Sequence, residues 1–101
     1  MTNKYILQGH DPIQINELSD WAQWFETADR VVAKTILNNV TISTVFLGLD
    51  HSWGTGLPVL FETLVFGGEM DGEMNRYSTW DEAVAGHNRM VNIVKGKNSC
   101  I

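Results

Sequence analysis

The sequence predicts an α+β domain in which an antiparallel sheet is packed by two amphipathic helices, in the order ββ-α-βββ-α. Runs rich in Val, Ile, Thr and Phe at 30–37, 40–49 and 59–66 are typical of strands joined by short links. Apolar residues recur at helical spacing within 16–28 and again from residue 80 to 94. At 101 residues, 44% of them hydrophobic, the chain is expected to form a single domain over 1–101.

The first expected element is a small hairpin at the N-terminus. An apolar run from Lys4 to Leu7 precedes the turn-forming stretch Gln-Gly-His-Asp-Pro at 8–12. Residues 13–15 then form the returning strand. This turn places His10 and Asp11 at the tip of the hairpin.

A helix is expected next, capped by Asn16 or Ser19 and ending near Ala28. Its apolar stripe contains three aromatic side chains, and acidic residues occupy the opposite side. The stripe predicts a helix face that lies on a sheet; the alternative is an aromatic surface that stacks on a ligand. The members of the stripe are Leu18, Trp21, Trp24, Phe25 and Ala28.

Three strands are predicted to follow as an antiparallel meander. Asn38 and Asn39 suit a two-residue turn, because Asn tolerates positive φ. The strand 59–66 has no face that is polar throughout, so we expect it to be central and covered at least partly on both sides. Glycines and acidic residues at 67–73 form a link to the last helix.

The last helix is expected to start at Ser78 or Thr79, with Asp81 or Glu82 completing a capping box. Its apolar stripe continues to Val94, and Gly96 is the expected stop. His87 lies in the middle of this stripe. The tail 97–101 is expected to fray.

Composition argues against several classes of function. The net charge is −5, and the seven Lys and Arg residues are scattered, so no nucleic-acid binding is expected. The single cysteine, Cys100, suits a reducing compartment. The N-terminus has no signal-peptide core and no run is long enough to span a membrane. These features predict a cytoplasmic protein without a membrane, a metal or another cofactor.

Two loops gather the polar groups that could act in binding. One holds His10 and Asp11; the other holds Asp50, His51 and Trp53. A shared site with mixed histidine and carboxylate ligands requires the two loops to converge, and no metal-ligand spacing such as HExxH is present. The weak candidates for catalysis are Glu62, His51 and His87.

Each of these residues also has a structural interpretation. A histidine in an apolar stripe, such as His87, usually satisfies a hydrogen bond at the edge of the core. Glu62 interrupts an apolar strand, so it requires an ion pair or a pocket; Arg30, Lys34 and Arg76 are the possible partners. Trp53 is either a lid on the core or an anchor for a partner.

Three motifs together resemble those of small uncharacterised proteins of phages and prophages. They are the strand ending STVFLGLDH at 43–51, the strand LFETLVF at 60–66 and the helix start RYSTWDEAVAGH at 76–87. The helix segment at 21–30 is also similar. This resemblance implies expression in a bacterial cytoplasm, and it implies no particular activity.

The sequence therefore predicts a non-enzymatic accessory protein that binds a host or phage macromolecule, most simply a protein. The apolar character of the sheet is also compatible with a homodimer. Two alternatives stay open: a small metal- or ligand-binding enzyme that uses the loops 9–12 and 50–56, and a component of the virion or of its assembly.

Overall fold

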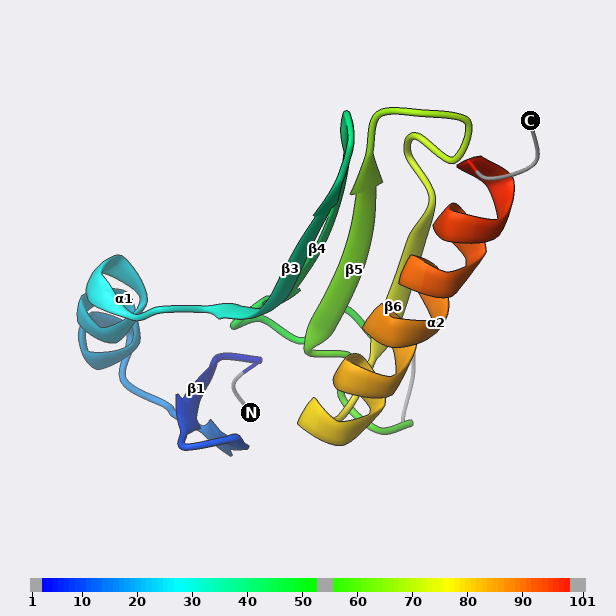
Figure 1. Cartoon of the computed structure of the whole chain (residues 1–101). Helices are drawn as coiled ribbons and strands as arrows, with labels where there is room; N and C mark the ends of the chain where they lie inside the picture. The colour runs from blue at the N-terminus through cyan, green and yellow to red at the C-terminus, as the bar shows by residue number, and fades with distance from the viewer. Residues whose placement is uncertain (1–2, 53–55, 99–101) are drawn as a thin grey trace.

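The computed structural model describes residues 3–52 and 56–98, and it confirms the α+β class (Figure 1). The elements follow the order ββ-α-ββββ-α. All strand pairs are antiparallel, in a two-stranded sheet and a separate four-stranded sheet. The sequence-based order lacked one strand, β6 (Met74–Tyr77), which lies at an edge of the larger sheet.

The N-terminal hairpin is formed by β1 (Tyr5–Gln8) and β2 (Asp11–Gln14). The open end of this hairpin is attached to the segment that follows β4. The Tyr5 N–H donates to the Gly48 carbonyl at 2.8 Å, and Lys4 pairs with Leu49. The hairpin is therefore a small sheet of its own, whose open end is attached to the segment after β4.

Helix α1 (Leu18–Thr27) lies against β1, set apart from the four-stranded sheet (Figure 1). The Trp21 indole N–H lies within hydrogen-bond distance of the Tyr5 carbonyl, at 3.1 Å, and the Gly48 carbonyl, at 3.0 Å. Gly48 has φ 79°, and a Cβ there would lie 2.8 Å from the Phe25 ring, so this approach favours glycine. The helix therefore lies against the small two-stranded sheet, and α2 alone packs on the four-stranded one.

The N-terminus of α1 also differs from the expectation. Its N-cap is Glu17, and no side chain caps the helix, so neither Asn16 nor Ser19 takes that role. No residue of α1 is fully buried. Its aromatic residues instead cover the end of the core, where the Trp24 ring meets the Phe46 ring edge-on at 5.8 Å.

The larger sheet has the strand order β3-β4-β5-β6, where β3 spans Val31–Leu37, β4 spans Val40–Phe46 and β5 spans Phe61–Phe66. Asn38, with φ 56°, makes the predicted tight turn between β3 and β4. The strand β5 is interior, as its sequence indicated.

Helix α2 (Trp80–Asn98) packs on one face of this sheet (Figure 1). The predicted capping box is formed by Thr79 and Glu82: the Glu82 N–H donates to the Thr79 hydroxyl, and the Glu82 carboxylate accepts from the Thr79 N–H. The helix continues past Gly96, the expected stop. The buried apolar residues form two clusters beneath it, one of Val40, Ile42, Val65, Met90 and Val94, the other of Phe46, Leu60, Phe61 and Ala83.

Among residues 3–52 and 56–98, no helix packs on the opposite face of the four-stranded sheet. Side chains alternate along β4, so residues 40, 42, 44 and 46 are buried beneath α2 and residues 41, 43 and 45 are only partly covered. Phe66 at the end of β5 is 50% exposed. The expected cover of β5, at least partial on both sides, is complete on the α2 side and partial on the other, where Glu62 and Leu64 are partly buried.

The fold is extended for its length. The radius of gyration is 14.9 Å, whereas a compact chain of this length has about 13 Å. The hairpin and α1 extend beyond one end of the main sheet (Figure 1). Within the described residues, neither helix is long and apolar enough to cross a lipid bilayer.

Candidate functional site

The loop after Gly48 is organised around Asp50. One carboxylate oxygen accepts hydrogen bonds from the backbone N–H groups of Ser52, at 2.8 Å, and Val59, at 2.9 Å. The Asp50 N–H donates to the Asn3 carbonyl at 2.9 Å. Asp50 therefore joins the two ends of this loop to each other and to the N-terminal segment.

The environment of Asp50 favours its ionised form. Burial raises the pKa of the carboxyl, but the backbone N–H groups of Ser52 and Val59 lower it by more, aided by the Ser52 side chain and by the charge of His51. The pKa consequently lies below the ordinary value of 3.8. The ionised Asp50 carboxylate thus serves to close the loop, because one of its oxygens already accepts two backbone hydrogen bonds.

The remaining candidates of this loop do not extend it into a site. His51 is exposed, and its backbone N–H donates to the Val59 carbonyl at 2.9 Å. Trp53 lies outside the described residues, so its role as a lid or an anchor stays a prediction.

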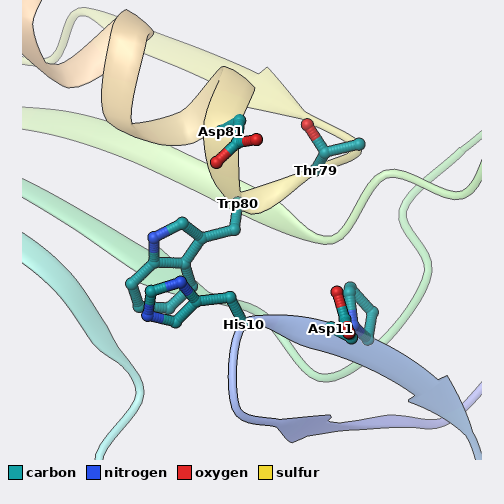
Figure 2. A pocket seen from close by; sticks show the side chains of 6 residues that line it. His10, Asp11, Thr79, Trp80 and Asp81 are labelled. Carbon is teal, nitrogen blue, oxygen red and sulfur yellow. The ribbon is translucent and has the colours of Figure 1, made fainter.

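His10 lies at the tip of the β1–β2 hairpin and stacks on Trp80 at the start of α2. The two ring centroids are 3.8 Å apart and the rings are nearly parallel, at 5° (Figure 2). They border an open pocket of about 280 Å³. Its other lining residues are Asp11, Pro12, Thr79 and Asp81. The stack holds the hairpin tip against α2, and the pocket is the hollow between them.

The described residues of the two loops do not form one site. Asp50 is bonded to Asn3, at the open end of the hairpin, whereas His10 is at its closed end. The strands between them are four residues long, which corresponds to roughly 13 Å. Within residues 3–52 and 56–98, no group of three or more His, Cys, Asp or Glu side chains is placed to hold a metal ion. The geometry therefore gives no support to a shared metal or catalytic centre.

His87 is buried between α2 and the sheet, with only 3% of its surface exposed. Its Nε2 lies 2.8 Å from the Thr35 hydroxyl and its Nδ1 lies 2.7 Å from the Thr44 hydroxyl. Thr44 in turn is hydrogen-bonded to the hydroxyl of Thr63 at 2.5 Å. Burial lowers the pKa of His87 below its ordinary value of 6.5, which favours the neutral ring. The expected hydrogen-bonding role is present, with threonine hydroxyls as partners.

Glu62 forms the ion pair that its position in the sequence required. Its carboxylate accepts a hydrogen bond from Arg76 Nε at 3.0 Å, and the two residues are direct cross-strand neighbours on β5 and β6. Both side chains lie on the face of the sheet that α2 leaves open. This ion pair accounts for Glu62 without a pocket.

That open face is a feature that the candidate residues, apart from Glu62, did not include. We call it the uncovered face and define it by the outward-facing residues of the four strands, as their alternation and register place them. These are Val31, Lys34 and Ile36 of β3, Thr41, Ser43 and Val45 of β4, Glu62, Leu64 and Phe66 of β5, and Met74 and Arg76 of β6.

The uncovered face is rich in exposed apolar side chains. Ile36 is 64% exposed and Phe66 50%, while Val31 and Met74 are each 47% exposed. Its charged residues are Lys34, Arg76 and Glu62, two cations and one anion, which gives a local charge of +1. The twelve acidic residues all lie in the described ranges, and of them only Glu62 is on this face. Apolar surface with few carboxylates is typical of the centre of a protein–protein interface.

The sequence does carry a signal for this surface, which is the apolar character of outward-facing strand positions. In β5 the alternate positions 64 and 66 are apolar although they lie on the side away from α2. On the same face, Val45 of β4 and Ile36 of β3 are apolar too. Apart from Glu62, the face holds no candidate residue, so the motifs gave no reason to select it.

Comparisons with protein-family models, with curated proteins and with solved structures find no match to this chain.

Proposed function

We propose that this protein is a non-catalytic binding protein that acts on another protein through the uncovered face. The observation that carries the proposal is the set of half-exposed apolar side chains on that face: Val31, Ile36, Phe66 and Met74. Fully burying an apolar side chain is worth about 1.5–3 kcal/mol, so covering the exposed part of each of these contributes about half of that, and a partner that covers them gains affinity.

The polar candidates support this proposal by being already engaged. The Asp50 carboxylate closes its own loop, His87 is bonded to two threonines and Glu62 is paired with Arg76. An enzyme needs a nucleophile, acid or base that can reach a substrate. None of these three side chains is placed to act as such a group, so the geometry supports a binding protein better than an enzyme.

The biological setting is part of the same proposal. The resemblance to phage and prophage proteins favours an accessory protein in the cytoplasm of a bacterium, where its partner is a host protein or a phage protein, itself included. A structural part of the virion would use the same kind of surface. Absence of the protein from purified particles would exclude that alternative.

A capture experiment with matched variants tests the proposal. Phe66→Lys places a charge on the uncovered face, whereas Ile93→Lys changes a residue of nearly equal exposure, 47%, on α2. Each immobilised variant is offered either bacterial lysate or the purified, untagged chain. We expect the wild type and Ile93→Lys to retain the same partner protein. Phe66→Lys should lose it. Equal retention by both variants would contradict the use of this face.

A further inference from the structure

We infer that the hydrogen bonds around His87 run in a single direction, which places the ring proton on Nε2 and makes the packing of α2 on the sheet sensitive to acid. The groups concerned are the His87 ring and the hydroxyls of Thr35, Thr44 and Thr63, which we call the threonine–histidine chain. This chain lies beneath α2, so the inference does not depend on the uncovered face or on a partner there.

The middle of the threonine–histidine chain allows two arrangements of its protons. The Thr44 hydroxyl has one proton, and its oxygen lies 2.5 Å from the Thr63 hydroxyl and 2.7 Å from His87 Nδ1. If Thr44 donates to Nδ1, it accepts from Thr63; if it donates to Thr63, it accepts from a protonated Nδ1. A neutral imidazole has one N–H, so the first arrangement puts the ring proton on Nε2 and the second puts it on Nδ1.

The two ends of the chain decide between these arrangements. Thr63 is fully buried, at 0% exposure, and Thr44 is the one partner of its hydroxyl among the described residues. At the other end, Thr35 lies 2.8 Å from Nε2 and is partly exposed on the edge strand β3, so water can accept its proton. The first arrangement alone gives every buried proton an acceptor, because the second leaves the Thr63 proton with none. That loss disfavours the second arrangement by about tenfold or more.

Proton uptake by the ring would reverse this order. The added proton goes to Nδ1, the nitrogen that accepts from Thr44 in the neutral state. Thr44 must then turn its own proton toward Thr63, whose proton loses its acceptor. A buried charge and an unpaired buried donor therefore appear together. Burial already lowers the pKa of His87, so both effects oppose the charged ring while α2 is packed on the sheet.

The surroundings of the ring offer no charge to offset this cost within the described residues. The residues that β3, β4 and β5 turn toward α2 are neutral, and β6 adds the phenol of Tyr77, which lies beside Gly86. The carboxylates of the loop at 67–73 are exposed, although Met70 of that loop packs on the core. The charged residues of α2 are exposed too, and those of the strands lie on the uncovered face. They are Asp81, Glu82, Arg89, Lys95 and Lys97 of α2, and Lys34, Glu62 and Arg76 of the strands.

NMR spectroscopy of the full chain at neutral pH tests the direction of the chain. Long-range correlations from the ring C–H protons to the two ring nitrogens show which nitrogen carries the proton. We expect the Nε2–H form of His87 to dominate by about tenfold or more, with slowly exchanging hydroxyl protons on Thr44 and Thr63. The exposed ring of His51 in the same spectra is the reference for a histidine in solvent. A His87 proton on Nδ1 would overturn the inference.

Two matched variants test the same direction through stability. Thr35→Val leaves the Nε2–H donor without its acceptor, whereas Thr63→Val removes a donor and leaves Thr44 still bonded to Nδ1. We expect Thr35→Val to raise the unfolding equilibrium constant by about tenfold in urea denaturation, and Thr63→Val by about threefold or less. This order is the reverse of their burial, because Thr63 is the more deeply buried of the two. A larger effect for Thr63→Val would mean that the chain runs the other way.

Lowering the pH tests the acid response. A proton on His87 Nδ1 should appear only together with faster exchange of the Thr63 hydroxyl proton or with loss of the native amide signals of α2. A folded chain with a protonated Nδ1 and a Thr63 hydroxyl proton that still exchanges slowly would overturn the inference. These measurements need no partner protein, so their outcome is separate from that of the capture experiment.

Discussion

The Nδ1 atom of His87 lies 2.7 Å from the Thr44 hydroxyl, between the two apolar clusters of the core. The Thr44 hydroxyl also bonds Thr63, and the other ring nitrogen of His87 bonds Thr35. A polar layer therefore crosses the core from β3 to β5. Because each bond has one favourable geometry, this layer fixes how α2 sits on the sheet.

Thr44 is the threonine of this layer whose hydroxyl has two side-chain partners, so among the three hydroxyls it should matter most. Thr44→Val keeps the shape but leaves His87 Nδ1 and the Thr63 hydroxyl without that partner. We expect the free energy of unfolding to fall by about 1–3 kcal/mol, measured by urea denaturation. Thr41→Val, on the uncovered face of the same strand, is the control and should change stability little. Equal effects at the two positions would contradict the role of the layer.

The same layer should make stability depend on pH. The unfolded chain takes up a proton on His87 near its ordinary pKa of 6.5, while burial holds the folded pKa lower. Between these two values the unfolded state binds more protons. The contribution to the free energy of unfolding is therefore complete above pH 6.5 and declines as the pH falls, by up to about 1.4 kcal/mol per pH unit.

The charged side chains of the sheet lie on the uncovered face, away from His87; they are Lys34, Glu62 and Arg76. The register therefore places no carboxylate of β3 to β6 beside the His87 ring, where it would stabilise the protonated form. NMR titration of the His87 ring measures its pKa directly, and urea denaturation across pH measures the decline. A ring that titrates at or above 6.5 would refute this prediction.

Gly86 is placed where α2 crosses Tyr77. A Cβ at this position would lie 2.1 Å from the Cζ and Oη atoms of Tyr77, so Gly86→Ala forces the ring to move. We expect a loss of about 1–3 kcal/mol by thermal or urea unfolding, despite the better helix propensity of alanine. Gly96→Ala is the control, because its Cβ meets nothing within 4 Å. That substitution should stabilise α2 by up to about 1 kcal/mol.

Tyr77 offers a second test of the same contact. Its hydroxyl is buried and has no hydrogen-bond partner within residues 3–52 and 56–98. Tyr77→Phe removes this unpaired group and keeps the ring, so the variant should be as stable as the wild type or more stable by about 1 kcal/mol. A clear loss of stability in urea denaturation would reveal a partner for the hydroxyl.

Most of the fold follows from local patterns in the sequence. The helical stripe from Trp80 to Val94, the capping residues Thr79 and Glu82 and the Asn38 turn all appear where propensity and spacing predict them. Each of these features depends on residues a few positions apart in the chain, so the local sequence pattern is enough to predict it.

The parts that were missed depend on tertiary contacts. Helical spacing shows that α1 has an apolar stripe, but the partners of Trp21 are backbone carbonyls, which carry no sequence signature. The strand β6 is exposed except at Tyr77, because it is an edge strand, and Asn75 and Arg76 are polar, so its composition resembles a loop. The partners of His87 lie on two different strands, and only the sheet register brings them together.

The central claim is that the uncovered face is a protein-binding surface. Hydroxyl-radical footprinting of the full chain, free and in complex with the protein that it captures, tests it most directly. The account predicts that oxidation of Met74 and Phe66 is lower in the complex, while that of Leu57, which is 74% exposed and off this face, stays constant. Equal oxidation of Met74 and Phe66 in the free chain and in the complex would contradict it.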